Sequence, residues 1–144
     1  MNHLMTDIEA MGTGRYGMIT QIGACYFDIE TGKLGGGFSV NISMENSFKE
    51  GFVIDPGAVK FWLGETNRTF LDGDLKSARD ALGSYYGFAS KADIMWSHLF
   101  DFVMIQDALE KLKLPKLMWK KWRDINTLVW LSGLKKSKTD NVRS

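Results

Sequence analysis

The 144-residue chain contains a single cysteine, Cys25, so it cannot form an internal disulfide. Disulfides are typical of secreted proteins, and their exclusion favours a reducing, cytoplasmic location. No apolar run approaches the ~20 residues that cross a bilayer, which argues against a membrane-spanning helix. The opening MNHLMTDIEAMG carries two acidic residues where a signal peptide has a basic start and an apolar stretch. We therefore expect no association with a membrane.

The chain also lacks a large net charge, because 18 basic residues nearly balance 17 acidic ones. The two signs are unevenly distributed: 8 Lys/Arg and 15 Asp/Glu occur through residue 110, against 10 and 2 from residue 111 onward. Acidic clusters bind divalent metals, and basic tracts bind phosphates. A solvated helix followed by a frayed tail would give the same asymmetry, so both interpretations stay open.

Four apolar stretches predict strands. They cover residues 3–9, residues 17–31, residues 38–43 and residues 92–97. The turn signal at Thr31-Gly32 and the glycine-rich GKLGGG connection favour antiparallel pairing of the first three. The last, ADIMWS, reads as a short buried strand.

Helical signals dominate the rest of the chain. Asp55 followed by Pro56 predicts a helix start that leads into GAVKFWLGE. Further helices are expected over 75–89, over 102–114 with its end at Pro115, and over INTLVWLSG between Asp124 and Gly133. This order of elements predicts an α/β fold with a mixed central sheet. We expect one domain over residues 1–134 and a polar, disordered tail over 135–144.

Asp7 and Glu9 form the sharpest chemical feature. Strand residues i and i+2 face the same side, so the two carboxylates stand together while Ile8 faces the opposite side. Adjacent carboxylates repel each other, and a divalent cation between them removes that cost. The glycine-rich MGTGRYG that follows lets a ligand approach the backbone closely. A solvated strand edge has the same spacing, so the pattern alone does not decide.

Asp101 is the second candidate. It follows the strand expected at 92–97 and begins a helix, a position where α/β folds build sites. From the local sequence a helix-capping role explains Asp101 more simply, and capping is also the interpretation we prefer for Asp124.

Five segments together resemble the RNase T-like branch of the DEDD exonucleases, and within it the phage and prophage group. They are, in order along nearly the whole chain, HLMTDIEAMGTG, ITQIGACYFD, VKFWL, IMWSHLFDFVMIQDALEKL and WRDINTLVWL. The resemblance implies a ribonuclease-H-like fold and removal of nucleotides from the 3′ ends of DNA or RNA by two Mg²⁺ or Mn²⁺ ions. It assigns Asp7, Glu9 and Asp101 as catalytic metal ligands. The family's Arg-Asp pair matches Arg123 and Asp124, as structural or substrate-side residues.

Aromatic residues are candidates for two further roles. Phe61 and Trp62 could stack on the terminal base, although packing inside the domain is the simpler expectation for Trp62. Trp119, Trp122 and Trp130 could form an apolar patch through which a homodimer assembles, or belong to the core.

Two features depart from the family pattern. The family carries a general-base histidine followed by an aspartate on a late helix, and no histidine follows His98 here. The segment from Ser97 to Asp101 is also about two residues shorter than usual, and small displacements of catalytic groups are costly. We expect a C-terminally shortened domain with weakened or lost activity, or one that another chain completes. A non-catalytic nucleic-acid-binding member of the same fold is the alternative function.

Overall fold

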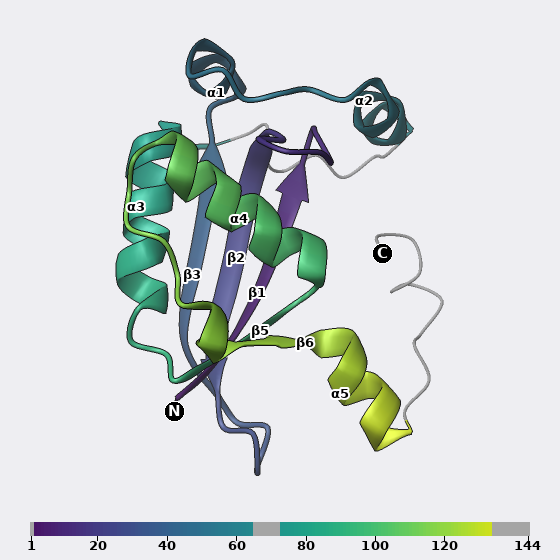
Figure 1. Ribbon diagram of the computed structural model, residues 1–144, viewed down its shortest axis with the longest axis vertical. Coiled ribbons are helices and arrows are strands. Elements are labelled where there is room, and N and C mark those ends of the chain that lie inside the picture. Colours follow the sequence, from purple (N-terminus) through teal and green to yellow (C-terminus); the bar gives the residue numbers. More distant parts are fainter. Residues whose placement is uncertain (1, 65–72, 134–144) are drawn as a thin grey trace.

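The computed structural model describes residues 2–64 and 73–133 (Figure 1). The tail expected at 135–144 lies outside the described residues. The strands are β1 His3–Ala10, β2 Ile19–Phe27, β3 Leu34–Ile42, β4 Leu75–Lys76, β5 Ile94–Ser97 and β6 Trp122–Asp124. The helices are α1 Met44–Lys49, α2 Pro56–Leu63, α3 Ala78–Ala89, α4 Leu99–Lys111 and α5 Ile125–Ser132, with a 3₁₀ turn at Trp119–Lys121.

The strands form one six-stranded mixed sheet in the order β4-β3-β2-β1-β5-β6. β1, β2 and β3 pair antiparallel, while β4, β5 and β6 join the edges in parallel. Helices α3 and α4 lie across one face of this sheet (Figure 1). The expected α/β fold with an antiparallel three-stranded start is therefore confirmed. No helix in the described part of the chain is long and apolar enough to cross a bilayer.

The third strand begins earlier than expected. The prediction placed the glycines of GKLGGG in a flexible connection, but β3 starts at Leu34 and includes Gly37, which pairs with Cys25. The turn is confined to residues 28–33, where the Asp28 N–H donates to the Lys33 carbonyl at 2.9 Å. Glycine disfavours strands on its own, and pairing with β2 overrides that preference.

Three short elements were missed. Helix α1 follows Ser43, whose side chain accepts a hydrogen bond from the Asn46 N–H. The helix expected over 75–89 instead starts after the Ser77 cap, because Leu75–Lys76 form β4 beside β3. β6 was missed too, since a three-residue strand has no usable periodicity.

The predicted boundaries of α2, α4 and α5 agree more closely with the structure. α2 begins at Pro56 with Asp55 as its cap, and α5 runs from its Asp124 cap to Gly133, which has a φ of 71°. α4 starts three residues before the predicted position and ends at Lys111, ahead of Pro115. The chain turns there through Lys113, whose φ of 58° is left-handed.

The core lies between the sheet and helices α3 and α4. α4 contributes Phe102, Ile105 and Leu109, whereas its Val103 is only partly buried. From α3, the buried Tyr85 hydroxyl hydrogen-bonds the Thr6 hydroxyl at 2.8 Å. Burial raises the pKa of Tyr85 to about 12, so it stays protonated. This bond ties α3 to β1 one residue before Asp7.

A loop at residues 11–18 closes the end of β1 and packs against residues 51–55. The Met18 N–H donates to the Val53 carbonyl at 2.9 Å, and the Asp55 N–H donates to the Met11 carbonyl at 2.7 Å. The two backbones approach so closely that a Cβ at Gly12 would overlap the Val53 carbonyl oxygen. Glycine at position 12 is thus required by contact between two backbone segments.

We predict that Gly12→Ala destabilises the protein, because the added methyl group meets backbone atoms that cannot rotate away. The expected loss is at least ~1–3 kcal/mol in the free energy of unfolding, measured by urea denaturation. Gly14→Ala is the matched control, since a Cβ there meets nothing within 4 Å. Equal stability of the two variants would contradict the close approach.

Candidate functional site

The predicted metal residues Asp7 and Glu9 occupy the end of β1 that β5 leaves uncovered. β5 pairs with β1 only as far as Met5, so beyond that point β1 has a strand neighbour on the β2 side alone. Leu4 and Thr6 are buried under the helices, whereas Asp7 is exposed, as strand alternation requires. Glu9 is partly buried, and the pairing register shifts immediately after it.

Asp101 lies against this open edge of β1. It stands in the first turn of α4, whose cap is His98, so the expectation that Asp101 caps the helix is wrong. Burial raises the pKa of Asp101 far above its ordinary value, to about 8, helped by the negative charge of Asp7 and a hydrogen bond to Asp7. A hydrogen bond from the backbone N–H of Ile8 acts in the opposite direction and only partly offsets the rise.

The carboxyl groups of Asp7 and Asp101 are therefore neighbours, and the negative charge of Glu9 also acts on Asp101. Asp101 Oδ2 is the one buried side-chain oxygen among the described residues that has no hydrogen-bond partner. Buried acceptors without partners and like charges at close range both cost free energy. Within residues 2–64 and 73–133, no three His, Cys, Asp or Glu side chains converge into a ready-made ion site. The donor set still fits a hard divalent cation between Asp7 and Asp101, because carboxylate oxygens are the ligands such ions prefer.

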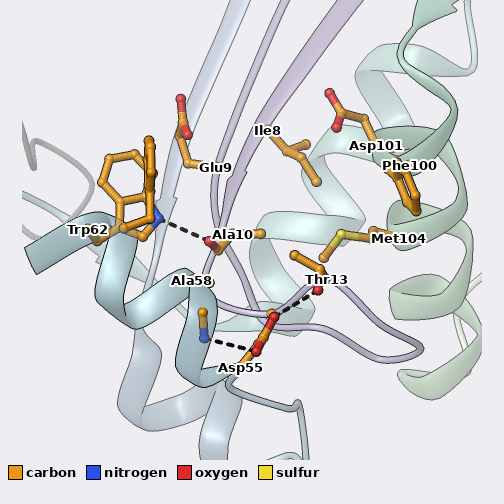
Figure 2. Close-up of a pocket in the computed structure, with 13 residues that line it drawn as sticks. Ile8, Glu9, Ala10, Thr13, Asp55, Ala58, Trp62, Phe100, Asp101 and Met104 are labelled. Carbon is orange, nitrogen blue, oxygen red and sulfur yellow. Dashed lines mark hydrogen bonds between the residues drawn. The ribbon is translucent and has the colours of Figure 1, made fainter. Parts of the chain in front are cut away.

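A pocket of about 510 Å³ opens beside these carboxylates (Figure 2). This volume is within the range of small-molecule sites. Its walls come from the end of β1, the loop that follows, α2 and the first turns of α4. The lining residues are Ile8, Glu9, Ala10, Gly12, Thr13, Asp55, Gly57, Ala58, Phe61, Trp62, Phe100, Asp101 and Met104.

The aromatic side chains of the pocket divide into two kinds. Trp62 is 5% exposed, and its indole N–H donates to the Ala10 carbonyl at 3.1 Å, so it anchors α2 to the end of β1. Phe61 lines the pocket with 37% exposure and packs edge-on against Trp62. Phe100 is 70% exposed at the pocket and was not a candidate from sequence. Its position beside Asp101, off the buried stripe of α4, is the signal that would have found it.

Sequence reasoning also missed a polar pair in the pocket. Asp55 Oδ2 accepts a hydrogen bond from the Thr13 hydroxyl at 2.9 Å, and Asp55 Oδ1 accepts one from the Gly57 N–H at 3.0 Å. Asp55 was predicted only as the cap of α2. Figure 2 shows this pair at the opposite end of the pocket from Glu9 and Asp101. Only the folded chain brings residue 13 to residue 55.

The Arg-Asp pair lies away from the pocket lining. Arg123 Nη1 donates to the carbonyls of Lys120 and Trp122, both at 2.8 Å, so it braces its own turn. Asp124 caps α5 by accepting from the Asn126 N–H at 3.1 Å, which confirms its expected capping role.

The remaining candidates are the three tryptophans and His98. Trp122 is partly buried and stacks on Phe102, whereas Trp119 and Trp130 are exposed. His98 Nδ1 lies 3.2 Å from the side-chain nitrogen of Asn126, which links the starts of α4 and α5.

A family model for the 3′–5′ exoribonuclease Rv2179c-like domain matches residues 2–144. No curated protein sequence matches the chain significantly.

Solved structures of E. coli exonuclease I share the arrangement of elements. The complex with a dT13 oligonucleotide is 14% identical with a TM-score of 0.68, covering 96% of this chain and 32% of that one. The complex with a 5cy-dA13 oligonucleotide is 14% identical with a TM-score of 0.67, covering 88% and 28%. The zinc-bound complex with single-stranded DNA is 15% identical with a TM-score of 0.69, covering 88% and 28%.

The chain thus spans 32% or less of the length of the protein in these three structures. At such low identity the likeness shows the fold, and the expected ribonuclease-H-like fold is confirmed.

We predict that Asp101 makes the metal-free protein less stable as the pH rises. Between the ordinary pKa of 3.8 and the folded value of about 8, the native state holds a proton that the unfolded state has released. The contribution of Asp101 to the free energy of unfolding is therefore fully present below pH 3.8. It falls by up to about 1.4 kcal/mol per pH unit as the pH rises from there through the folded pKa of about 8. Urea unfolding with a chelator present, from pH 5 to pH 8.5, measures the slope.

Asp101→Asn is the comparison that isolates this contribution. It removes the titrating group and keeps a side chain of similar shape, so its stability should depend less on pH over the same window. Parallel stability curves for the parent and the variant would show that Asp101 does not carry the shift.

Proposed function

Because this chain belongs to the family of Rv2179c-like 3′–5′ exoribonuclease domains, we propose that it hydrolyses phosphodiester bonds at the 3′ end of RNA or DNA with divalent cations. The observation that carries this proposal is one pocket with two carboxylates at one end and aromatic walls beside them. A terminal nucleotide presents matching chemistry, an anionic phosphate joined to a planar base.

The carboxylates would hold the metal ions. Asp7 and Asp101 are neighbours at the open edge of β1, and Glu9 reaches the pocket from the same strand. Bound Mg²⁺ or Mn²⁺, two ions in our proposal, would activate water and neutralise charge on the phosphate. Asp101 supplies a buried oxygen without a competing hydrogen bond, which favours an ion over a solvent-filled site. Tyr85 and Thr6 hold β1 in place directly before Asp7.

The aromatic wall would position the terminal base. Phe61 and Phe100 expose their rings at the pocket, and base–aromatic stacking contributes about 1–3 kcal/mol per base. Trp62 is committed to Ala10 and supports the wall by holding α2 in place. For Arg123, its two backbone hydrogen bonds favour a structural role over contact with substrate.

Several narrower assignments belong to the same proposal. They are membership of the RNase T-like branch and its phage group, assembly as a homodimer, and a cytoplasmic location, which the single cysteine supports. The family assignment favours the exonuclease over a non-catalytic nucleic-acid-binding protein. No histidine lines the pocket within the described residues, so we propose that this chain alone is a slow enzyme.

We predict that 5′-labelled single-stranded oligonucleotides shorten from the 3′ end when Mn²⁺ is present and stay intact with a chelator. RNA and DNA are assayed in parallel on denaturing gels. Asp7→Ala should lower the rate on the order of 100-fold, because it removes a ligand and misplaces the ions. Asp93→Asn, an exposed carboxylate before β5, is the charge-matched control and should cleave like the parent. Cleavage by Asp7→Ala at the rate of the parent would contradict the assignment of Asp7 as a metal ligand.

We further predict that Phe61→Ala raises KM for oligonucleotides by about tenfold and leaves kcat within a few-fold, because stacking energy is lost in both ground and transition states. Phe48→Ala removes an exposed aromatic ring from α1, outside the pocket, and serves as the control. Steady-state kinetics test this prediction, on whichever of RNA and DNA the parent cleaves faster. An unchanged KM for Phe61→Ala would place the base elsewhere.

A further inference from the structure

The end of the pocket formed by Asp55 and Thr13 offers a ligand only hydrogen-bond acceptors. Asp55 accepts from both Thr13 and Gly57, so the hydrogen of the Thr13 hydroxyl and the N–H of Gly57 are both committed. A carboxylate has about four acceptor positions, and two are used here. The atoms left to face a ligand, Asp55 Oδ1, Asp55 Oδ2 and Thr13 Oγ1, therefore all accept hydrogen bonds.

None of the described residues that line the pocket carries a positive charge to balance these acceptors. Among the described residues, the pocket lining contains Glu9, Asp55 and Asp101 but no Lys, Arg or His. In the proposed function the phosphate binds at the Glu9 and Asp101 end, with metal ions. Asp55 lies at the other end, across the aromatic walls (Figure 2). The part of a terminal nucleotide that points away from the scissile phosphate approaches Asp55.

We infer that Asp55 selects terminal nucleotides that present a hydrogen-bond donor at this end of the pocket. The inference rests on the proposed nucleotide site and adds a selectivity to it. The donor is either the exocyclic amine of a base, which cytosine has and uracil lacks, or a hydroxyl of the terminal sugar. Asp55 is partly buried, so a nucleotide that fills the pocket displaces water from its acceptor positions, and nucleotides without the donor bind more weakly.

The test titrates three probes against the protein with Mn²⁺ present: CMP, UMP and 2′,3′-dideoxycytidine 5′-monophosphate. Calorimetry measures each affinity. CMP should bind on the order of tenfold more tightly than the probe that lacks the donor. Weaker UMP identifies the base amine as the donor, and weaker dideoxy-CMP identifies the sugar hydroxyl.

Two variants assign the preference to Asp55. Asp55→Asn and Asp55→Ser keep residues that cap helices well, so α2 retains its start. Asp55→Ser should lose the preference. Asp55→Asn should lose it or reverse it, because its amide can turn a donor towards the ligand. Asp93→Asn carries the same charge change before β5 and should keep the parental preference.

The outcomes separate this inference from the proposed function. Equal affinity of the parent for all three probes, or an unchanged preference in folded Asp55→Asn and Asp55→Ser, overturns the role of Asp55. If oligonucleotides are still shortened from the 3′ end in either case, the exonuclease assignment stands. If the folded parent neither binds the probes nor cleaves, the proposed function fails and the inference fails with it.

Discussion

The site depends on one electrostatic constraint, the burial of the Asp101 carboxyl group beside Asp7. Burial, and after it the negative charge of Asp7, raise the pKa of Asp101 to about 8. The Oδ2 atom of Asp101 also has no hydrogen-bond partner, which is unfavourable for a buried oxygen. A fold keeps such an arrangement only where the surrounding packing enforces it. Here α4 is held by Phe102, Ile105 and Leu109 in the core, so its first turn cannot move Asp101 away from β1.

The shape of the sheet explains why the carboxylates meet at this point. β5 stops pairing with β1 after Met5, and the chain then leaves the sheet to begin α4. The uncovered length of β1 carries Asp7 and Glu9, and the helix start takes the place of a strand neighbour. The loop at residues 11–18 and helix α2 then close the pocket. Gly12 allows the backbone of this loop to approach Val53 closely, and the hydrogen bond from Trp62 to the Ala10 carbonyl fixes α2 to the end of β1. Glu9, Asp55 and Asp101 make the pocket lining rich in hydrogen-bond acceptors, which is why we propose that cations balance its charge and that donors in the ligand decide its selectivity.

Several elements show what local sequence can and cannot predict. Caps at Asp55 and Asp124 were predictable because a short polar side chain before an apolar stretch satisfies the free N–H groups of a helix start. The glycines in β3 and the two residues of β4 were not, because their conformation comes from hydrogen bonds to β2 and β3 respectively. Asp101 shows the same limit of local sequence in the site. Its local sequence suits a helix cap, but in the folded chain His98 is the cap and Asp101 lies against Asp7 of β1.

The sequence by itself determined the fold class and the order of the main elements, and its i, i+2 spacing singled out Asp7 and Glu9 as candidates, because periodicity, caps and spacing are local properties. Only the tertiary structure decided which residues share the pocket. It showed that Trp62 is buried while Phe61 is partly exposed, and that Phe100 lines the pocket whereas Arg123 does not. It also showed that Thr13 hydrogen-bonds Asp55, 42 positions away in the sequence. Contacts between distant segments depend on how the sheet ends and the helices pack, and no local pattern records that arrangement.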